Sequence, residues 1–415
     1  MNLTVTKNTP VLLRGAWLYV GLLSVVGCLN YLDRTMITTM RTSIVADLPM
    51  TDAQFGLLTS IFLWVYGLLS PLAGYLADKY SRTKVIIISL CVWSIVTWFT
   101  GHAKSFEQLL IARALMGISE ACYIPAALAL IVDYHKATTR SLATGIHMAG
   151  IMAGQSLGFI GGWIAEKSGW SAAFNVLGIL GVVYSIMLVF VLRDYPTRSL
   201  EKSTSSTTDE VSLMQGVKEM FQNSSFLKVL AYWSLMGVVS WLVMGWLPTY
   251  YKEHFNLTQT AAGLYATGYL YPASLLGVLA GGFFADKWSK TNPRARILVP
   301  VLGISFAAPF IFMASSTALL PLAIVFFMIY AFTRSFSDAN MMPILCLIAD
   351  KRYRATGYGI LNMFSCFVGG IALYAGGYLR DANFDLSGIY RFAAATMVVC
   401  AIILYKVKPK EMIVE

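Results

Sequence analysis

The sequence has 415 residues, of which 57% are hydrophobic and only 13% are charged. Soluble globular domains carry about 25% charged residues, so the composition excludes a water-soluble globular protein. The formal net charge of +10 arises mainly from Lys and Arg residues that flank apolar segments, so no nucleic-acid partner is expected.

Twelve apolar segments follow one another along the chain. Each is close to the ~20 residues that an α-helix needs to cross ~30 Å of hydrocarbon. The alternation typical of membrane β-strands, over about ten residues, is absent. We therefore predict an all-α membrane protein with twelve transmembrane helices. In chain order these are residues 14–40, 52–77, 83–101, 106–132, 141–165, 172–192, 226–251, 260–285, 295–314, 318–349, 355–379 and 388–407.

Lys and Arg residues are unevenly shared between the two sides of the predicted membrane domain. Most of the 31 lie on one set of flanks. The opposite flanks hold only Arg41, Lys104, Lys167, Lys252, Arg380 and Arg391. Because cytoplasmic flanks are enriched in Lys and Arg, both termini are predicted to be cytoplasmic, in the plasma (bacterial inner) membrane. Residues 1–13 carry no cleavable signal pattern, since the next apolar run continues through a full span.

The longest polar segment, residues 193–223, divides the chain into two halves. Its Ser, Thr and charged residues are too polar to form a hydrophobic core, so we predict a cytoplasmic linker. A short amphipathic helix is expected near residues 211–221. Six predicted helices precede it, in residues 1–192, and six follow it, in residues 224–415. We predict two six-helix bundles.

The halves also resemble each other in sequence. Asp78 in Gly-Tyr-Leu-Ala-Asp-Lys follows the second helix, and Asp286 in Gly-Phe-Phe-Ala-Asp-Lys follows the eighth. An acidic residue precedes a proline by five positions in both the fourth and the tenth helix. These matches predict an internal duplication, for which a substrate site near the midplane between the repeats is expected.

Six charged residues lie inside the predicted helices. A charge at a bilayer centre costs at least ~2.5–3.5 kcal/mol, and such residues usually mark an ion or substrate pathway. Three of the six are positive and three are negative, so their formal charges sum to zero. An anion can enter without changing this sum if a proton enters with it. The six are Asp33, Arg34, Arg113, Glu120, Arg334 and Asp338.

The fourth helix carries Arg113 and Glu120 on one face, two turns apart. Gly117 between them allows a neighbouring helix or ligand to approach closely, and Pro125 can kink the helix just beyond Glu120. A static buried ion pair remains an alternative. A functional pair is favoured, because groups two turns apart cannot pair directly without other residues.

In the first helix Asp33 and Arg34 are adjacent and point in different directions. Asn30, Arg34 and Thr38 share one stripe, which predicts a polar cavity face. The planar fork of Arg34 suits bidentate capture of a carboxylate.

Arg334 and Asp338 in the tenth helix are four residues apart and can form a direct salt bridge. A structural role and a substrate-binding role are equally open for this pair. Weaker candidates for lining a cavity could equally serve helix packing or an interfacial aromatic belt. They are His147 and Gln155 on the fifth helix, Tyr265 and Tyr269 on the eighth, and Asn362 on the eleventh.

The run Gly74-Tyr-Leu-Ala-Asp-Lys-Tyr-Ser-Arg-Thr-Lys84 resembles the loop motif of the major facilitator superfamily, and the six-plus-six layout agrees with that fold. Asn30-Tyr-Leu-Asp-Arg34 and Arg113-Ala-Leu-Met-Gly-Ile-Ser-Glu120 are similar to the anion:cation symporter family, which includes hexuronate and galactonate symporters and the sialin and vesicular glutamate carriers. The second motif also resembles Spinster-type transporters.

The resemblance implies roles for individual residues. Asp33 and Glu120 would carry a coupling proton, while Arg34 and Arg113 would engage the substrate or hold Glu120. A gating network on the cytoplasmic side would contain Asp78, Arg82 and Asp133, with Asp286 as an imperfect second copy.

The function expected from sequence is therefore proton-coupled symport of a small organic anion, a sugar acid or similar carboxylate, by alternating access. The protein would work as a monomer in a lipid bilayer. The alternative is a Spinster-like exporter or facilitator of a lipid-like or neutral substrate. No metal-binding spacing, nucleophile motif or nucleotide-binding loop occurs in the sequence, so we expect neither an enzyme nor a cofactor or metal besides the proton.

Overall fold

The computed structural model describes residues 15–135, 137–194, 213–350 and 354–409, and within these ranges every regular element is a helix. Twelve stretches are long and apolar enough to span a membrane, which confirms the predicted fold class. The first half contains α1 (Ala16–Thr39), α2 (Arg41–Asp47), α3 (Asp52–Lys79), α4 (Arg82–Thr100), α5 (Phe106–Ala121), α6 (Tyr123–Tyr134), α7 (Ala137–Ser156), α8 (Phe159–Ser168) and α9 (Trp170–Val191).

The second half repeats this arrangement. It contains α11 (Leu213–Gln222), α12 (Ser224–His254), α13 (Gln259–Gly263), the π-helix η1 (Leu264–Tyr269), α14 (Leu270–Ser289), α15 (Ala295–Ala314), α16 (Leu320–Arg334), α17 (Phe336–Ile348), α18 (Arg354–Asp381) and α19 (Leu386–Tyr405). The short helix α11 lies where an amphipathic helix was expected. The rest of the predicted linker, residues 195–212, lies outside the described residues.

Four of the predicted helices are not continuous, and only the interruption of the fourth was expected. The fourth span breaks at Cys122, where Pro125 cannot donate to the carbonyl four residues earlier. The fifth breaks before Gly158, and the tenth breaks at Ser335. The eighth contains η1 just before Pro272, whose missing N–H accommodates a π-type turn. Hydrophobic periodicity runs through all these breaks, so it could not reveal them.

Small residues bring helices close together inside the first half. α7 lies along α1, and a Cβ atom at Gly154 would stand 2.1 Å from the backbone oxygen of Cys28. A larger side chain would therefore push α7 away from α1. On the outer surface large apolar side chains of α9, such as Val183 (58% exposed) and Phe190 (71% exposed), form a face suited to lipid.

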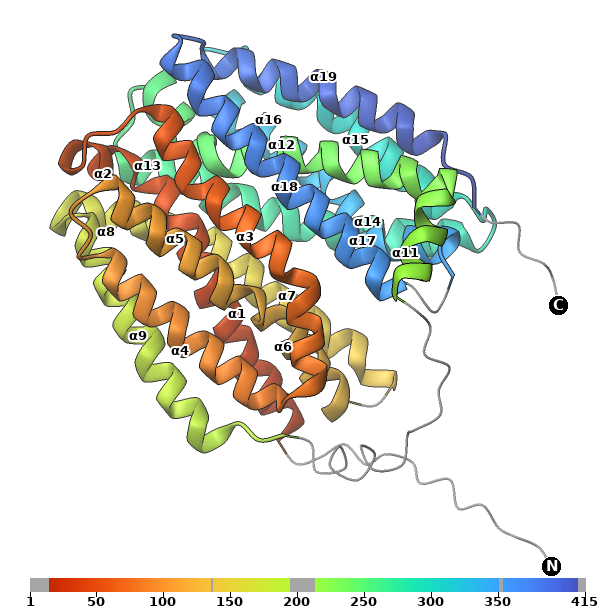
Figure 1. Cartoon of the computed structure of the whole chain (residues 1–415). Helices are drawn as coiled ribbons and strands as arrows, with labels where there is room; N and C mark the ends of the chain where they lie inside the picture. The colour runs from red at the N-terminus through yellow and green to blue at the C-terminus, as the bar shows by residue number, and fades with distance from the viewer. Residues whose placement is uncertain (1–14, 136, 195–212, 351–353, 410–415) are drawn as a thin grey trace, which may run out of the picture.

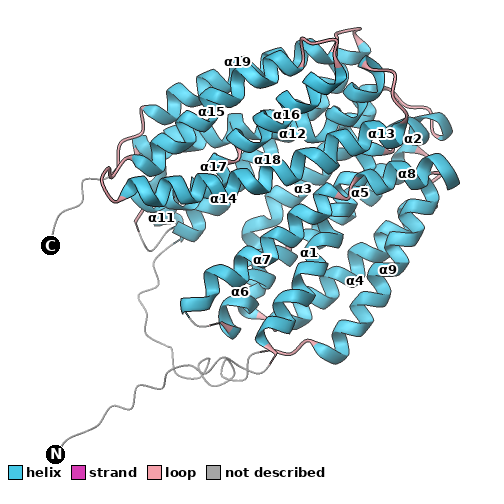
Figure 2. Ribbon diagram, turned by 180° about the vertical axis from the view of Figure 1, so that it is seen from behind, coloured by secondary structure: helices cyan, strands magenta, loops and turns pink. Residues whose placement is uncertain are grey.

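The two halves meet mainly through α3 and α18. In both views they approach each other at the end that carries α2, α8 and α13, and they diverge towards α6 and α17 (Figures 1 and 2). The two halves are thus in contact at the end that carries α2, α8 and α13, far from the start of α1. We call this the outer end.

Candidate transport site

Arg34 and Glu120 form an ion pair in the interior of the first half. Nε of Arg34 donates to Oε2 of Glu120 at 2.5 Å, although the two residues are 86 positions apart. Their side chains are only 2% and 0% exposed. Asn30 lies beside the same carboxylate. The partner that Glu120 needs thus comes from α1 and not from Arg113 on its own helix.

Asp33 and Arg113 complete this buried charge cluster without forming a direct ion pair. Asp33 accepts a hydrogen bond from the hydroxyl of Thr97 on α4. Arg113 contacts the carbonyl oxygen of Leu58 and the sulfur of Met116, both at 3.5 Å. One oxygen of Asp33, Oδ1, and one nitrogen of Arg113, Nη2, have no hydrogen-bond partner. Nη2 of Arg34 and Oε1 of Glu120 also lack a partner, so each of the four charged residues of the cluster keeps one unpaired polar atom.

Three aromatic rings surround the guanidinium of Arg34. Its Cζ atom lies 4.6, 4.9 and 4.4 Å from the ring centroids of Tyr31, Phe62 and Tyr66. Phe62 also faces Arg113, whose Cζ lies 4.7 Å from the ring centroid. These rings stabilise buried positive charge by cation–π attraction. Phe62 and Tyr66 were not among the predicted site residues, although an aromatic i, i+4 pair on a helix next to the charges was a usable signal.

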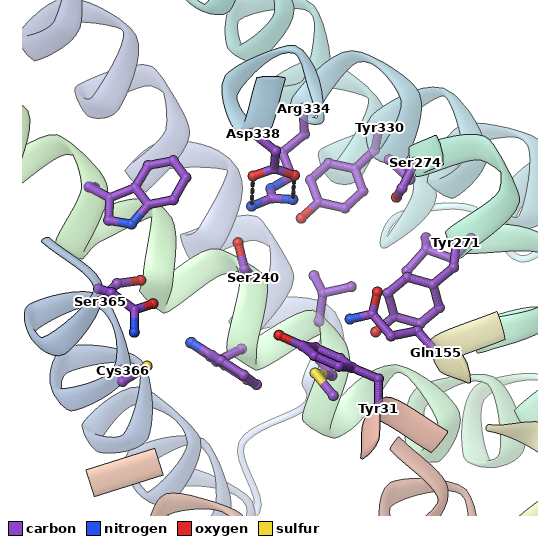
Figure 3. A pocket seen from close by; sticks show the side chains of 17 residues that line it. Tyr31, Gln155, Ser240, Tyr271, Ser274, Tyr330, Arg334, Asp338, Ser365 and Cys366 are labelled. Carbon is purple, nitrogen blue, oxygen red and sulfur yellow. Dashed lines mark hydrogen bonds and ion pairs between the residues drawn. The ribbon is translucent and has the colours of Figure 1, made fainter. Parts of the chain in front are cut away.

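A cavity of about 270 Å³ lies between the halves. The second half supplies most of its wall, and the first half contributes Tyr31 and Gln155 (Figure 3). The wall combines aromatic, hydroxyl and amide side chains. Its residues include Trp233, Ser240, Trp241, Tyr271, Ser274, Tyr330, Arg334, Asp338, Asn362, Ser365 and Cys366.

Arg334 and Asp338 face this cavity as a bidentate pair (Figure 3). Nη1 and Nη2 of Arg334 donate to Oδ2 and Oδ1 of Asp338 at 2.7 and 3.1 Å. Their side chains are 18% and 29% exposed, so this pair is far more accessible than the cluster around Arg34. The predicted salt bridge is present, and it lies in the cavity wall.

The structure separates the other predicted substrate-binding residues into two groups. Gln155 and Asn362 line the cavity, whereas seven others lie away from it. His147 is fully buried, with its ring 5.9 Å from that of Tyr123. The buried charge cluster holds Asn30, Arg34 and Arg113, Thr38 lies near Arg41, and Tyr265 and Tyr269 contact each other at 5.7 Å between ring centroids.

His147 and Gln155 were predicted to share one face, yet only Gln155 reaches the cavity. α7 packs against both α1 and α14. The His147 end of the helix therefore faces the interior of its own half, while the Gln155 end faces the other half.

Charged residues join the two halves at the outer end. Arg380 of α18 donates to Asp52 and to Glu253 at 2.9 Å in each case. Arg41 pairs with Asp52 and lies 3.5 Å from Glu253. The sequence placed Arg41 and Arg380 on the outer flanks but gave no sign that they share these carboxylates.

Two further carboxylates cap helices that belong to the opposite half. Asp381 accepts hydrogen bonds from the backbone N–H groups of Asp52 and Ala53, at 2.8 and 2.9 Å, where α3 begins. Glu166 accepts from the backbone N–H of Gln259 at 2.6 Å and from the hydroxyl of Thr260, where α13 begins. Each half thus supplies an N-terminal cap to the other, which stabilises the closed outer end.

The predicted gating residues lie at the opposite end. Arg82 pairs with Asp133 and donates to the carbonyl of Ala129 at 2.8 Å. Asp286 pairs with Arg296 at 2.9 Å. The side chain of Asp78 lies outside the described residues. Both halves therefore carry an internal ion pair between an Arg and an Asp at this end, and the two pairs use different positions of the repeat.

The whole chain was compared with known proteins. The family model of the Major Facilitator Superfamily matches residues 23–373. The chain is 29% identical to protein spinster homolog 1 of Xenopus tropicalis over 308 residues, which is 71% of this chain but only 59% of that relative. It is 26% identical to the probable sulfoacetate transporter SauU of Cupriavidus necator over 388 residues, 88% of each chain.

Solved structures show the same fold. A bacterial homolog of the human lysosomal transporter Spinster, in an inward-facing and occupied conformation, has a TM-score of 0.74 at 21% identity over 95% of each chain. The nucleoside transporter NupG, as its D323A mutant, has a TM-score of 0.73 at 14% identity, covering 93% of this chain and 99% of that one. The family model covers most of the sequence, and the fold agrees with it throughout: this chain belongs to the Major Facilitator Superfamily.

Proposed function

We propose that this integral membrane transporter carries out proton-coupled symport of a small organic anion by alternating access. The buried ion pair of Arg34 and Glu120, set beside the incompletely satisfied Asp33 and Arg113, is the observation that carries the proposal. Breaking such a pair leaves an uncompensated buried charge, which costs about 3–5 kcal/mol. Protonation of Glu120 makes this acid neutral and leaves the buried charge of Arg34 to pair with another anionic group, so proton binding and rearrangement of the cluster are coupled.

The orientation follows from the distribution of Lys and Arg residues. With both termini in the cytoplasm of a bacterial cell, the closed outer end faces the periplasm and the diverging end faces the cytoplasm. The ion pairs of Arg380 then close the outer gate. The protein works as a monomer in this proposal, with its two halves rocking about the cavity between them.

An anionic substrate is favoured by the arginine in the cavity wall. The curated relative SauU, which is aligned over nearly its whole length, is a probable sulfoacetate transporter. Sulfoacetate, galactonate and glucuronate are therefore the first compounds to test.

A lipid-like substrate is the second candidate. Trp233 and Trp241 line the same cavity and offer apolar surface beside the charged pair. Several curated relatives are spinster proteins. Transport of such an amphiphile would not require Arg34, whereas symport of an organic anion would.

The test is uptake of the three acids into proteoliposomes under an imposed pH gradient. Glu120→Gln is expected to abolish gradient-driven accumulation and to retain part of the exchange of labelled for unlabelled substrate. Arg34→Lys is expected to lower uptake at least about tenfold, since Lys lacks the Nε–H group that binds Glu120. Equal accumulation by wild type and Glu120→Gln would refute the coupling role, and uptake of none of the acids would refute the substrate class.

A further inference from the structure

The cavity between the halves contains one pair of opposite formal charges. Among the described residues that line it, Arg334 and Asp338 are the only acidic or basic ones. Both Nη atoms of Arg334 are engaged by the two oxygens of Asp338. This is the same fork geometry with which arginine binds a free carboxylate. Asp338 therefore occupies the position that an anionic ligand of Arg334 would take.

The backbone places these two residues on different helices. Arg334 is the last residue of α16, and Asp338 lies in the first turn of α17, beyond the break at Ser335. The N–H of Asp338 donates to the carbonyl of Ser335 at 3.1 Å. The pair therefore bridges a helix break, where a change in pairing can be accommodated by adjusting two short helices instead of bending a continuous one.

The other titratable groups around the pair are phenols and a thiol. Tyr330 of α16, Tyr232 of α12 and Tyr358 of α18 lie near enough to Asp338 to feel its charge, and Tyr271 of α14 to feel that of Arg334. Tyr31 and Cys366 complete this part of the wall. Phenols and buried thiols are neutral at neutral pH, so they offer hydrogen bonds and not charge. Among the described cavity residues, Asp338 alone can cancel its charge by taking up a proton.

We propose that Asp338 is a built-in competitor for the anionic group of the substrate on Arg334, and that a proton removes it. A proton that binds Asp338 makes this side chain neutral and frees the guanidinium fork. The carboxylate or sulfonate group of the substrate then accepts both N–H groups in its place. No covalent bond changes, and the cavity keeps a net charge of zero before and after a monoanion binds.

The substrate class follows from the same wall. A small acid with hydroxyl groups or a second oxyanion fits it, because Ser240, Ser274, Gln155 and Asn362 can bind the remaining polar atoms. The inference rests on the proposed anion symport and adds a second proton acceptor to it. Glu120 is fully buried outside the cavity wall, so the two acids have separate tasks.

Proton uptake on substrate binding tests the inference. Sulfoacetate or galactonate, whichever wild type takes up faster, is added to purified protein in weakly buffered detergent solution at pH 7.5, and a pH indicator reports released or bound protons. Asp338 is expected to take up about one proton per anion bound, so Glu120→Gln, which lacks the other proton acceptor, should still take up about one. Loss of the uptake in Glu120→Gln would overturn the inference while leaving proton-coupled symport intact.

Asp338→Asn supplies the complementary measurement. This variant mimics the protonated acid, so at pH 8 it is expected to bind the anion at least tenfold more tightly than wild type and to take up about one proton fewer per anion. Arg334→Lys is expected to bind at least tenfold more weakly at every pH. An Asp338→Asn protein with the wild-type pH dependence of binding would overturn the inference. The wild-type and Glu120→Gln comparison decides it without this variant if Asp338→Asn does not fold.

Discussion

Phe62 holds two buried arginines at once. Its ring centroid lies 4.9 Å from Cζ of Arg34 and 4.7 Å from Cζ of Arg113, and the side chain is 1% exposed. Two guanidinium groups that share one ring gain attraction without an additional carboxylate. The ring therefore helps to stabilise two positive charges close to Asp33 and Glu120.

Phe62→Leu should destabilise the protein, because leucine has no π-face for either arginine. The two cation–π contacts contribute about 0.5–2 kcal/mol each, so a clearly lower unfolding temperature is expected in detergent. Phe190→Leu is the matched control, since Phe190 is 71% exposed on the lipid-facing surface. Equal unfolding temperatures for the two variants would contradict the role assigned to Phe62.

The sequence predicted local pairs better than distant ones. Arg334 and Asp338 are four residues apart, so their contact was expected from helix geometry, and it is present although the helix breaks between them at Ser335. The roles of Arg34 and Glu120 were inferred from family resemblance, but their direct contact depends on how α1 packs against α5. Asp52 and Arg380 are 328 positions apart, and no local pattern connects them. Only the docking of the two halves brings that pair together.

At the scale of elements, α3 and α18 are held together by glycine. A Cβ atom at Gly377 would lie 2.2 Å from the carbonyl oxygen of Asp52, and one at Gly56 would lie 2.7 Å from that of Leu373. The two backbones are thus in direct contact near the outer end. Ser60 adds a hydrogen bond to the carbonyl of Gly370 at 2.6 Å. The contact between α3 and α18 requires small residues while the outer end is closed, and this requirement is lost when the outer end opens.

Gly377→Ala should shift the molecule towards the state with an open outer end, because the added methyl group cannot fit between α3 and α18. Spin labels at Lys104→Cys and Ser316→Cys, in a background without the native cysteines, report the distance between the halves there. A larger population of long distances is expected. Gly359→Ala on the same helix is the control, since nothing lies within 4 Å of its added Cβ. An unchanged distance distribution for Gly377→Ala would contradict this account.

The breaks within helices were predictable only in part. Pro125 indicated a kink beyond Glu120, and α5 does end at Ala121. The break before Gly158 had no comparable signal, since apolar residues continue through it. Pro272 was visible beyond η1, but it did not indicate a π-type turn. Glycine permits a break but does not require one. In these segments the packing of the halves decides the backbone path.

At the scale of the whole molecule, the closed end depends on reciprocal capping. Asp381 of the second half caps α3 of the first, and Glu166 of the first half caps α13 of the second. The arrangement follows the internal duplication, because the fifth and eleventh spans supply the carboxylates and the second and eighth spans supply the helix starts. Both caps are lost together when the halves separate at this end.

The double variant Glu166→Gln and Asp381→Asn should therefore open the outer end more than either single variant. A helix cap contributes about 0.5–2 kcal/mol, so losing two shifts the balance by about 1–4 kcal/mol. The same pair of spin labels measures the shift. Glu107→Gln is the control, since Glu107 lies in the first turn of α5 on the same side of the membrane, away from the other half. A double variant that matches this control would show that the caps do not hold the end closed.

The phenol ring of Tyr31 lies between the buried charge cluster around Arg34 and the cavity between the halves. It contacts Arg34 on one side and lines the cavity on the other. We infer that this ring hinders the passage of a proton from the cavity to Glu120. We expect the protein not to leak protons in the absence of substrate. Vesicles that contain it should hold an imposed pH gradient as long as vesicles without protein do. A cell could then keep the transporter in its membrane through long periods of starvation at no energetic loss.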